Sequence, residues 1–259
     1  MGMTCIAGRA GAGKTTRCLA VIRQALTAGT PVIVLVPEQD TVQAELMLAR
    51  QLELPVFWNL EVLSPKRLVR RVQGMAGGSA RVWLSDAGRA MALRGAMLSL
   101  RDSLKYFKSG SQGAADSMGD FLVELKRGEA DETALRLAAD RLPADGALAQ
   151  KLYDLAAIYE AYEGRMAGKY LDGEDALRAC AAQIAACQAL SDYIVVADGF
   201  DVLPRTTLRM LAALAGRCRA VYASFSVCAQ DAGDAALYEQ SRLSLETLRG
   251  MCAEGGVSF

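Results

Sequence analysis

The sequence of 259 residues contains no histidine. This absence excludes Ser-His and Cys-His nucleophile pairs, and histidine-ligated metal centres, from the chain. No apolar run approaches the roughly 18 residues that a membrane span requires. No basic, cleavable leader precedes the first glycine-rich turn, so we expect no signal peptide. The seven cysteines form no CxxC pair, which indicates buried thiols of a cytoplasmic protein rather than a disulfide framework or a zinc site. Chemistry in this chain must therefore come from backbone amides, lysine, hydroxyl groups and carboxylates.

The chain also has no net charge, with 29 basic and 29 acidic residues, so its total charge does not require a nucleic-acid partner. The charges are unevenly distributed along the sequence. Ten lysines and arginines lie between Lys66 and Lys108, against two acidic residues, which gives this segment a charge of +8. Residues 109–175 carry fourteen acidic and seven basic side chains, a charge of −7. A basic region is therefore followed by an acidic one.

Hydrophobic patterning predicts an α/β fold. Five apolar segments are too short for helices and predict buried strands: 3–7, 31–36, 56–63, 193–197 and 220–225. Helical spacing or helix-start signals follow them at 14–26, 41–52, 65–73, 205–215 and 235–252. Ser64 and Pro65, for example, supply an N-cap and a proline at the first helical position. Strands that alternate with helices are typical of a parallel, doubly wound sheet, so we expect a single parallel sheet.

A glycine-rich break at 74–79 interrupts this alternation. Beyond it the periodicity is helical, and it predicts five helices and no strand: 86–104, 113–127, 131–139, 146–167 and 173–187. The strand pattern then resumes. We therefore expect one α/β domain, made of residues 1–82 and 188–259, that is interrupted by a helical insertion at 83–187.

A glycine-rich loop stands between the first predicted strand and the first predicted helix. It fits the pattern GxxxxGK followed by Ser or Thr, and it consists of Gly8, Arg9, Ala10, Gly11, Ala12, Gly13, Lys14 and Thr15. Glycines let successive N–H groups turn inward around an anion, and the following helix presents its N-terminus to phosphates. We expect Lys14 to reach the β- and γ-phosphates of a nucleotide and the Thr15 hydroxyl to ligate Mg²⁺. The alternative is a chance glycine turn, which the strand–loop–helix context disfavours.

A second polar position follows the fourth predicted strand. Asp198 comes directly after the apolar run 193–197, at the carboxyl end of a parallel strand, where ligands collect in α/β sheets. A nucleotide-hydrolysing site needs such an aspartate for Mg²⁺, and a further group that orients the attacking water. The next residue is Gly199, so the metal-holding position is filled and the usual position of the catalytic base is not. The alternative is that Asp198 and Gly199 only form a turn.

Basic residues recur at helical spacing after the third predicted strand: Lys66, Arg67, Arg70 and Arg71. Such a stripe attracts the phosphate backbone of DNA or RNA. The same pattern is also typical of an ordinary solvated helix surface. The sequence leaves these two interpretations open.

Several stretches resemble the AddB family of bacterial helicase–nuclease subunits. They run nearly end to end in the order of the family: GRAGAGKTT at 8–16, VLVPEQDTVQAE at 34–45, VLSPKRLVRRV at 62–72, LSDAGRAMAL at 84–93, DFLVELKR at 120–127, YLDGEDA at 170–176 and VADGFDVLP at 196–204. The most specific are VPEQ after the glycine loop and DGF where a helicase carries DE.

The resemblance implies a P-loop NTPase fold of the superfamily 1 helicase type, with the α/β part as a first motor domain and the helical insertion as its accessory domain. It implies ATP and Mg²⁺ as ligands, an AddA-type partner subunit, and DNA as the substrate of a cytoplasmic complex that acts in double-strand break repair and recombination. It also implies a longer parent chain, with a second motor-like domain, a nuclease domain and an iron–sulfur cluster beyond Phe259.

The chain departs from an active helicase of this type at several points. Gly199 replaces the catalytic glutamate, and the seven residues before Gly8 leave no room for a glutamine motif that reads adenine. No GDxxQ-like motif occurs at 225–230, and the arginine fingers of a second motor domain are absent. We therefore expect weak Mg·ATP binding with negligible hydrolysis by this chain, and enzymatic activity only in the complex. The alternative function is a small-molecule P-loop kinase, for which the sequence shows no substrate site or set of lid arginines.

Overall fold

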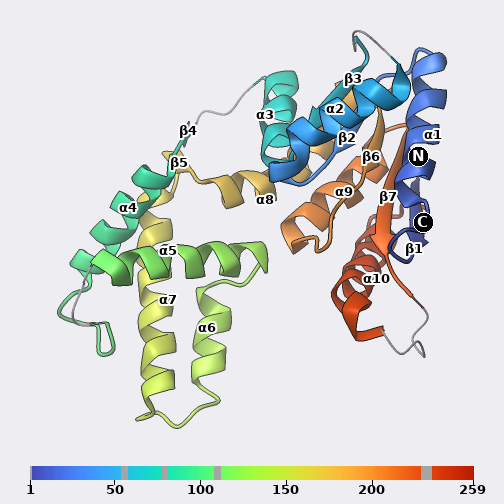
Figure 1. Cartoon of the computed structure of the whole chain (residues 1–259). Helices are drawn as coiled ribbons and strands as arrows, with labels where there is room; N and C mark the ends of the chain where they lie inside the picture. The colour runs from blue at the N-terminus through green and yellow to red at the C-terminus, as the bar shows by residue number, and fades with distance from the viewer. Residues whose placement is uncertain (1, 54–57, 78–80, 108–111, 229–234) are drawn as a thin grey trace. The chain divides into compact units, whose positions relative to one another are not determined.

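The computed structural model describes residues 2–53, 58–77, 81–107, 112–228 and 235–259. The chain divides into two compact units, one formed by Met1–Gly78 with Leu177–Phe259 and the other by Ser79–Ala176. Figure 1 labels the helices and strands of both units. The first unit is an α/β structure and the second is mostly helical.

A five-stranded parallel sheet forms the centre of the first unit, in the order β1-β7-β6-β2-β3. Its strands are β1 Met3–Gly8, β2 Val32–Leu35, β3 Leu60–Leu63, β6 Ile194–Ala197 and β7 Ala220–Ser226. All four residues of β2 are buried, as expected for a central parallel strand that is covered on both faces. The prediction of one parallel sheet from these five segments is confirmed for this unit. The predicted third strand is longer than β3, and its residues 56 and 57 lie outside the described residues.

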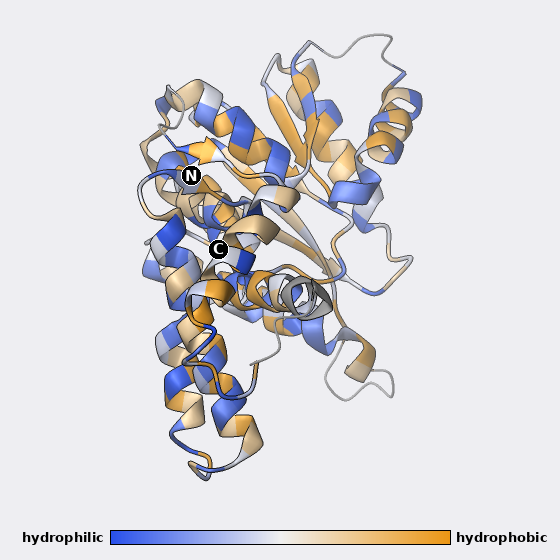
Figure 2. Ribbon diagram, turned by 90° about the vertical axis from the view of Figure 1, so that its left-hand side faces the viewer, coloured by the Kyte–Doolittle hydropathy of each residue, from blue (hydrophilic) through white to orange (hydrophobic). Residues whose placement is uncertain are grey.

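Helices connect these strands and bury their apolar faces against them. They are α1 Lys14–Thr27, α2 Thr41–Leu52, α3 Pro65–Ala76, α9 Arg205–Arg217 and α10 Glu239–Glu254, with short 3-10 turns at η1 Glu38–Asp40, η2 Gln188–Leu190 and η3 Ala235–Tyr238. One hydrophobic cluster joins α1, α2 and the sheet through Ile22, Leu48 and Val34. Figure 1 shows α1 and α9 on opposite sides of β7. In Figure 2 the strands are mainly orange, the colour of apolar residues, between helices that carry both colours.

The helix after β3 begins where the sequence predicts it. Pro65 is its first residue, and the Ser64 hydroxyl accepts a hydrogen bond from the Arg67 N–H at 3.3 Å. This contact satisfies one of the N–H groups that have no partner within the helix. Because all five strands are parallel, their carboxyl ends meet at one edge of the sheet, so Ser64, the glycine-rich loop after β1 and Asp198 after β6 all lie at that edge.

The second unit is built from helices that share one core. Its elements are β4 Val82–Trp83, α4 Asp86–Ser99, α5 Gln112–Arg127, α6 Glu132–Ala139, α7 Ala147–Met166 and β5 Tyr170–Leu171, after which α8 Gly173–Ala186 begins. The core includes Leu93, Leu122, Leu135 and Tyr159, which come from the four helices α4 to α7. Among the described residues, no helix has the length and apolar character needed to cross a membrane.

A short sheet in this unit contradicts the expectation from the sequence. β4 and β5 pair in parallel, with Val82 opposite Tyr170 and Trp83 opposite Leu171. Since β5 lies within residues 86–187, the predictions of a strand-free segment and of a single sheet in the chain are wrong. A strand of two residues cannot display an alternating pattern, so hydrophobic periodicity gives no signal for it. The predicted helix 86–104 is also too long, because α4 ends at Ser99.

Candidate functional site

The glycine-rich loop joins the carboxyl end of β1 to the first residue of α1. Gly11 and Gly13 have φ values of +76° and +81°, a left-handed conformation that other residues adopt only with strain. A Cβ atom added at either position would meet nothing within 4 Å, so the backbone conformation, and not a lack of space, requires glycine. Left-handed residues of this kind let successive N–H groups converge on an anion.

Lys14 is the first residue of α1, and its side chain folds back over the loop. Its Nζ donates hydrogen bonds to the carbonyl oxygens of Gly8 at 3.1 Å and Arg9 at 2.8 Å. In this described helix, no side chain caps the N-terminus and the first turn contains no acidic residue. A cation in the first turn opposes the helix dipole, so Lys14 does not stabilise α1 by its charge. An anion at this position would be attracted both by Lys14 and by the N–H groups of the helix terminus.

Asp198 lies at the same edge of the sheet as this loop. Its Oδ1 accepts a hydrogen bond from the hydroxyl of Ser224, which lies on β7, the strand between β1 and β6. Two strand spacings of about 4.8 Å each therefore separate the backbones of β1 and β6. Burial and, second, the negative charge of Asp198 raise the pKa of the Cys18 thiol on α1 to about 12. The sequence analysis predicts Asp198 as a site residue but not Ser224. A serine within an otherwise apolar strand is the sequence signal that could identify Ser224.

Gly199 has a structural reason to be glycine. Its φ is +82°, and a Cβ atom at this position would come within 3.7 Å of Pro37 Cδ, which is an ordinary contact. The conformation, rather than the space, is therefore the obstacle to another residue. A non-glycine residue in a left-handed conformation costs roughly 1–2 kcal/mol. The backbone conformation thus disfavours a glutamate at the position after Asp198.

Arg71, one of the predicted DNA-contacting residues, is engaged within the protein. Its Nε donates to Glu61 Oε2 and its Nη2 to Glu61 Oε1, both at 2.8 Å, and Nη2 also lies 3.5 Å from the Tyr193 hydroxyl. The hydrogen bonds to Glu61 raise the pKa of Arg71 above its ordinary value. This two-pronged ion pair ties α3 to β3, so Arg71 has a structural role.

The other three predicted DNA contacts, Lys66, Arg67 and Arg70, are exposed near the start of α3 and are called the α3 cations below. Lys66 Nζ lies 3.7 Å from Glu38 Oε2, and Arg67 Nη1 lies 3.7 Å from Glu45 Oε1. These are loose, solvent-exposed pairs, which contribute little to stability. Lys66 and Arg67 therefore remain accessible to a charged ligand.

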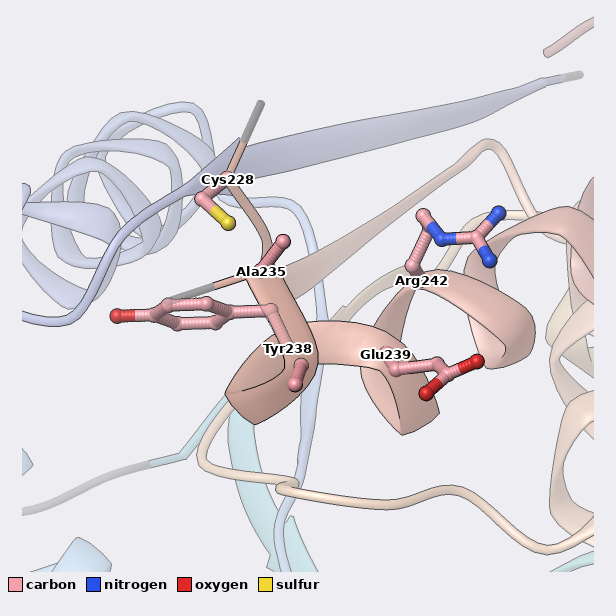
Figure 3. A pocket seen from close by; sticks show the side chains of 6 residues that line it. Cys228, Ala235, Tyr238, Glu239 and Arg242 are labelled. Atoms are coloured by element: carbon pink, nitrogen blue, oxygen red, sulfur yellow. The ribbon is translucent and has the colours of Figure 1, made fainter. Parts of the chain in front are cut away.

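A pocket of about 290 Å³ lies between the segment after β7 and the start of α10 (Figure 3). It is lined by Cys228, Ala235, Ala236, Tyr238, Glu239 and Arg242. The Val227 N–H donates to the Gly8 carbonyl at 3.0 Å, so Cys228, the next residue, lies beside the glycine-rich loop. No sequence motif marks this pocket, because its lining residues come from two separate segments.

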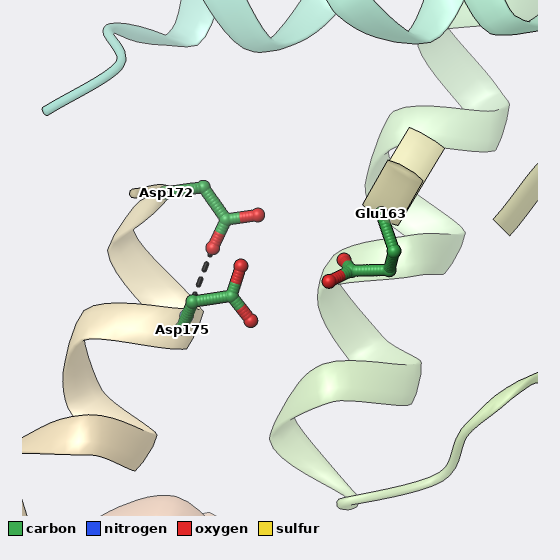
Figure 4. Close-up of side chains that lie close together, drawn as sticks. All are labelled: Glu163, Asp172 and Asp175. Carbon is green, nitrogen blue, oxygen red and sulfur yellow. Dashed lines mark hydrogen bonds between the residues drawn. The ribbon is translucent and has the colours of Figure 1, made fainter. Parts of the chain in front are cut away.

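The second unit contains a buried ion-pair cluster that the sequence does not predict either. Lys126 Nζ lies 2.6 Å from Glu163 Oε1, 2.6 Å from Asp172 Oδ2 and 2.7 Å from Asp175 Oδ2. We call Lys126 and these three carboxylates the Lys126 cluster. Figure 4 shows that the carboxylates come from α7 and from the start of α8. Their oxygens lie close enough to hold a metal ion, but the ammonium group is already bound among them. The cluster is therefore an ion-pair network rather than a metal site.

Two carboxyl groups of the Lys126 cluster, Asp172 and Asp175, have pKa values that are shifted in opposite directions. Burial opposes the ionisation of Asp172, but the charge of Lys126 and a backbone N–H hold the pKa of Asp172 below its ordinary value. Burial and, second, the charge of Asp172 raise the pKa of Asp175 to about 6. Asp172 Oδ1 also accepts hydrogen bonds from the N–H groups of Glu174 at 3.0 Å and Asp175 at 2.9 Å, which fixes the first turn of α8.

The fold and the site define the chain as an α/β protein whose parallel sheet carries a glycine-rich loop and an aspartate at its carboxyl edge. The chain belongs to the AddB family, because the family model described as "ADDB, N-terminal" matches residues 5–259.

Three bacterial relatives are named as the B-type subunit of an ATP-dependent helicase/deoxyribonuclease. The protein of Heliobacterium modesticaldum is 39% identical over 229 residues, which cover 85% of this chain and 19% of that protein. The protein of Moorella thermoacetica is 38% identical over 210 residues, 78% of this chain and 18% of that protein. The protein of Pelotomaculum thermopropionicum is 39% identical over 245 residues, 90% of this chain and 21% of that protein. The chain thus spans about a fifth of the length of these relatives.

Proposed function

We propose that this chain binds Mg·ATP through Gly8–Thr15 and Asp198, hydrolyses it little or not at all, and serves as the amino-terminal part of a DNA-handling helicase–nuclease subunit. One observation carries the nucleotide proposal: the glycine-rich loop, with Lys14 folded over it, shares a sheet edge with Asp198. The name of the relatives, which includes "ATP-dependent", agrees with ATP as the ligand.

The residues at this edge fit a nucleotide triphosphate and Mg²⁺. The left-handed glycines, the uncapped start of α1 and Lys14 supply N–H donors and positive charge for phosphates. The Thr15 hydroxyl, which is exposed in the first turn of α1, and the Asp198 carboxylate are hard oxygen ligands of the type that Mg²⁺ prefers. When bound, Mg²⁺ would neutralise charge on the β- and γ-phosphates. This fit supports a P-loop NTPase of the helicase type.

Slow or absent hydrolysis follows from what the site does not supply. Gly199 offers no carboxylate to orient a water molecule, and its φ of +82° disfavours a glutamate there. We therefore assign the site to nucleotide binding rather than to a motor cycle.

For the full-length protein we propose the role that the relatives' names describe. It would pair with an AddA-type subunit, act on DNA in double-strand break repair and recombination, and work in the cytoplasm. The helical segment 83–187 would serve as an accessory domain, and the α3 cations would contact DNA. Nuclease and iron–sulfur residues would lie beyond Phe259.

Calorimetric titration with Mg·ATP tests the nucleotide proposal. We expect saturable binding by the chain, loss of binding in Lys14→Ala, and unchanged affinity in the matched control Arg17→Ala, which removes an exposed cation from the same helix. A phosphate-release assay on the same samples should show no turnover above background. Robust turnover that disappears in Lys14→Ala would refute slow hydrolysis, and the absence of binding at any nucleotide concentration would refute the site.

A further inference from the structure

We propose that Ser224 is the positioning residue for the Asp198 carboxylate, and that it holds one carboxylate oxygen so that the other can ligate a divalent cation. This inference rests on the proposed Mg·ATP site and assigns a role within it. Ser224 lies near the carboxyl end of β7, where Val221, Ala223 and Phe225 are buried apolar residues. Ser224 itself is only 6% exposed, and its hydroxyl donates to Asp198 Oδ1.

The position of β7 explains why this residue can act on the site. The strand lies between β1, which leads into the glycine-rich loop, and β6, which leads into Asp198. Ser224 pairs in register with Ile6 of β1, and Ala223 pairs with Ala197, the residue before Asp198. Ser224 is therefore a polar side chain on the strand that separates the two halves of the proposed site.

Asp198 is held from both neighbouring strands. Its N–H donates to the Leu35 carbonyl of β2 at 3.0 Å, which fixes the backbone, and Ser224 fixes the side chain from β7. Within the described part of the chain, no other side chain donates a hydrogen bond to this carboxylate. The hydrogen bond to Oδ1 thus limits rotation of the carboxylate and leaves Oδ2 for a metal ion.

The surroundings of Asp198 also favour a hard cation. The ligands at this position are oxygens, as Mg²⁺ or Mn²⁺ requires.

The chemistry predicts a specific defect when the hydroxyl is removed. Residues that orient a metal ligand typically change metal affinity by about 10- to 100-fold when they are mutated. Ser224→Ala should therefore weaken the Mg²⁺-dependent part of ATP binding by about tenfold or more, and leave ATP binding in EDTA unchanged. Ser224→Thr keeps the hydroxyl and should restore most of the Mg²⁺ dependence. If Ser224 only packed within β7, its replacement would change ATP affinity equally in the presence of Mg²⁺ and in EDTA.

The test is calorimetric titration of ATP at several Mg²⁺ concentrations and in EDTA, on wild type, Ser224→Ala, Ser224→Thr and Asp198→Asn, with thermal melts as a folding check. We expect Ser224→Ala to have no further effect in the Asp198→Asn background. Unchanged Mg²⁺ dependence in Ser224→Ala, or a loss as large in Ser224→Thr, would overturn the inference while the nucleotide site stands. If the wild-type chain binds no ATP, the proposed function fails and this inference fails with it.

Discussion

Replacing Lys126 with methionine should destabilise the second unit strongly. The substitution removes the cation that Glu163, Asp172 and Asp175 share at 2.6–2.7 Å, in a place where the Lys126 side chain is 4% exposed. The largely buried carboxylates of Asp172 and Asp175 would then lose their shared cation, although Asp172 would keep hydrogen bonds from the Tyr162 hydroxyl and from two backbone N–H groups. Breaking a buried ion pair by removing one partner costs about 3–5 kcal/mol. Since domains are typically stable by about 5–15 kcal/mol, this loss is a large share of the total.

The assay is urea unfolding of the variant beside a matched control from the same unit. Arg136 Nη2 lies 2.5 Å from Glu160 Oε2, but this pair is exposed, with side chains at 47% and 64%. Arg136→Met should therefore cost less than about 1 kcal/mol. Amide hydrogen exchange should show faster opening of α5 and of the start of α8 in Lys126→Met. Equal and small effects of the two substitutions would refute the reasoning from burial.

Three further predictions follow from particular side chains. Burial and a neighbouring carboxylate raise the pKa of Asp175 from 3.8 to about 6. Between these pH values the folded state binds more protons than the unfolded state, so the stability of the wild type falls as the pH rises through this window. The stability of Asp175→Asn relative to wild type should therefore rise between about pH 4 and pH 6, measured by urea unfolding, and parallel stability curves would contradict this. Gly13→Ala should weaken Mg·ATP binding in calorimetry and cost about 1 kcal/mol of stability, because Gly13 has a φ of +81°. Unchanged affinity would show that the loop binds the nucleotide in another conformation. Charge reversal of the α3 cations should weaken single-stranded DNA binding by the assembled complex and reduce the salt dependence of that binding. Arg71→Met should instead lower the stability of the fold. An unchanged salt dependence would identify the α3 cations as solvated surface.

Much of the fold of the first unit could be predicted because its signals are local. The run from Val32 to Leu35 is apolar at every position, as a strand buried on both faces must be. Ser64 and Pro65 predict the start of α3, because an N-cap side chain accepts a hydrogen bond from the N–H group three positions further on. The parallel arrangement then places the glycine-rich loop and Asp198 at one edge, since every strand of the sheet points the same way.

The features that the sequence did not predict depend on contacts between distant residues. Lys126 meets Asp172 across 46 positions, and no local pattern links the two. Ser224 meets Asp198 across 26 positions, through a strand order that the sequence does not specify. The sequence likewise shows that Arg71 is charged, but it does not show that Arg71 pairs with Glu61, the contact that gives Arg71 its structural role.

The most direct test of a shared Mg·ATP site is a double-mutant cycle between Thr15 and Asp198. Thr15→Val removes the hydroxyl of the loop and keeps a branched side chain, and Asp198→Asn removes the carboxylate charge on the other side of β7. If both residues hold the same metal ion, each change should weaken Mg·ATP binding in calorimetry, and the double variant should lose little more than the worse single one. The coupling energy should then lie at about 0.5–3 kcal/mol. Additive losses, with a coupling energy near zero, or full affinity in all three variants would contradict a metal–nucleotide site built from these two residues.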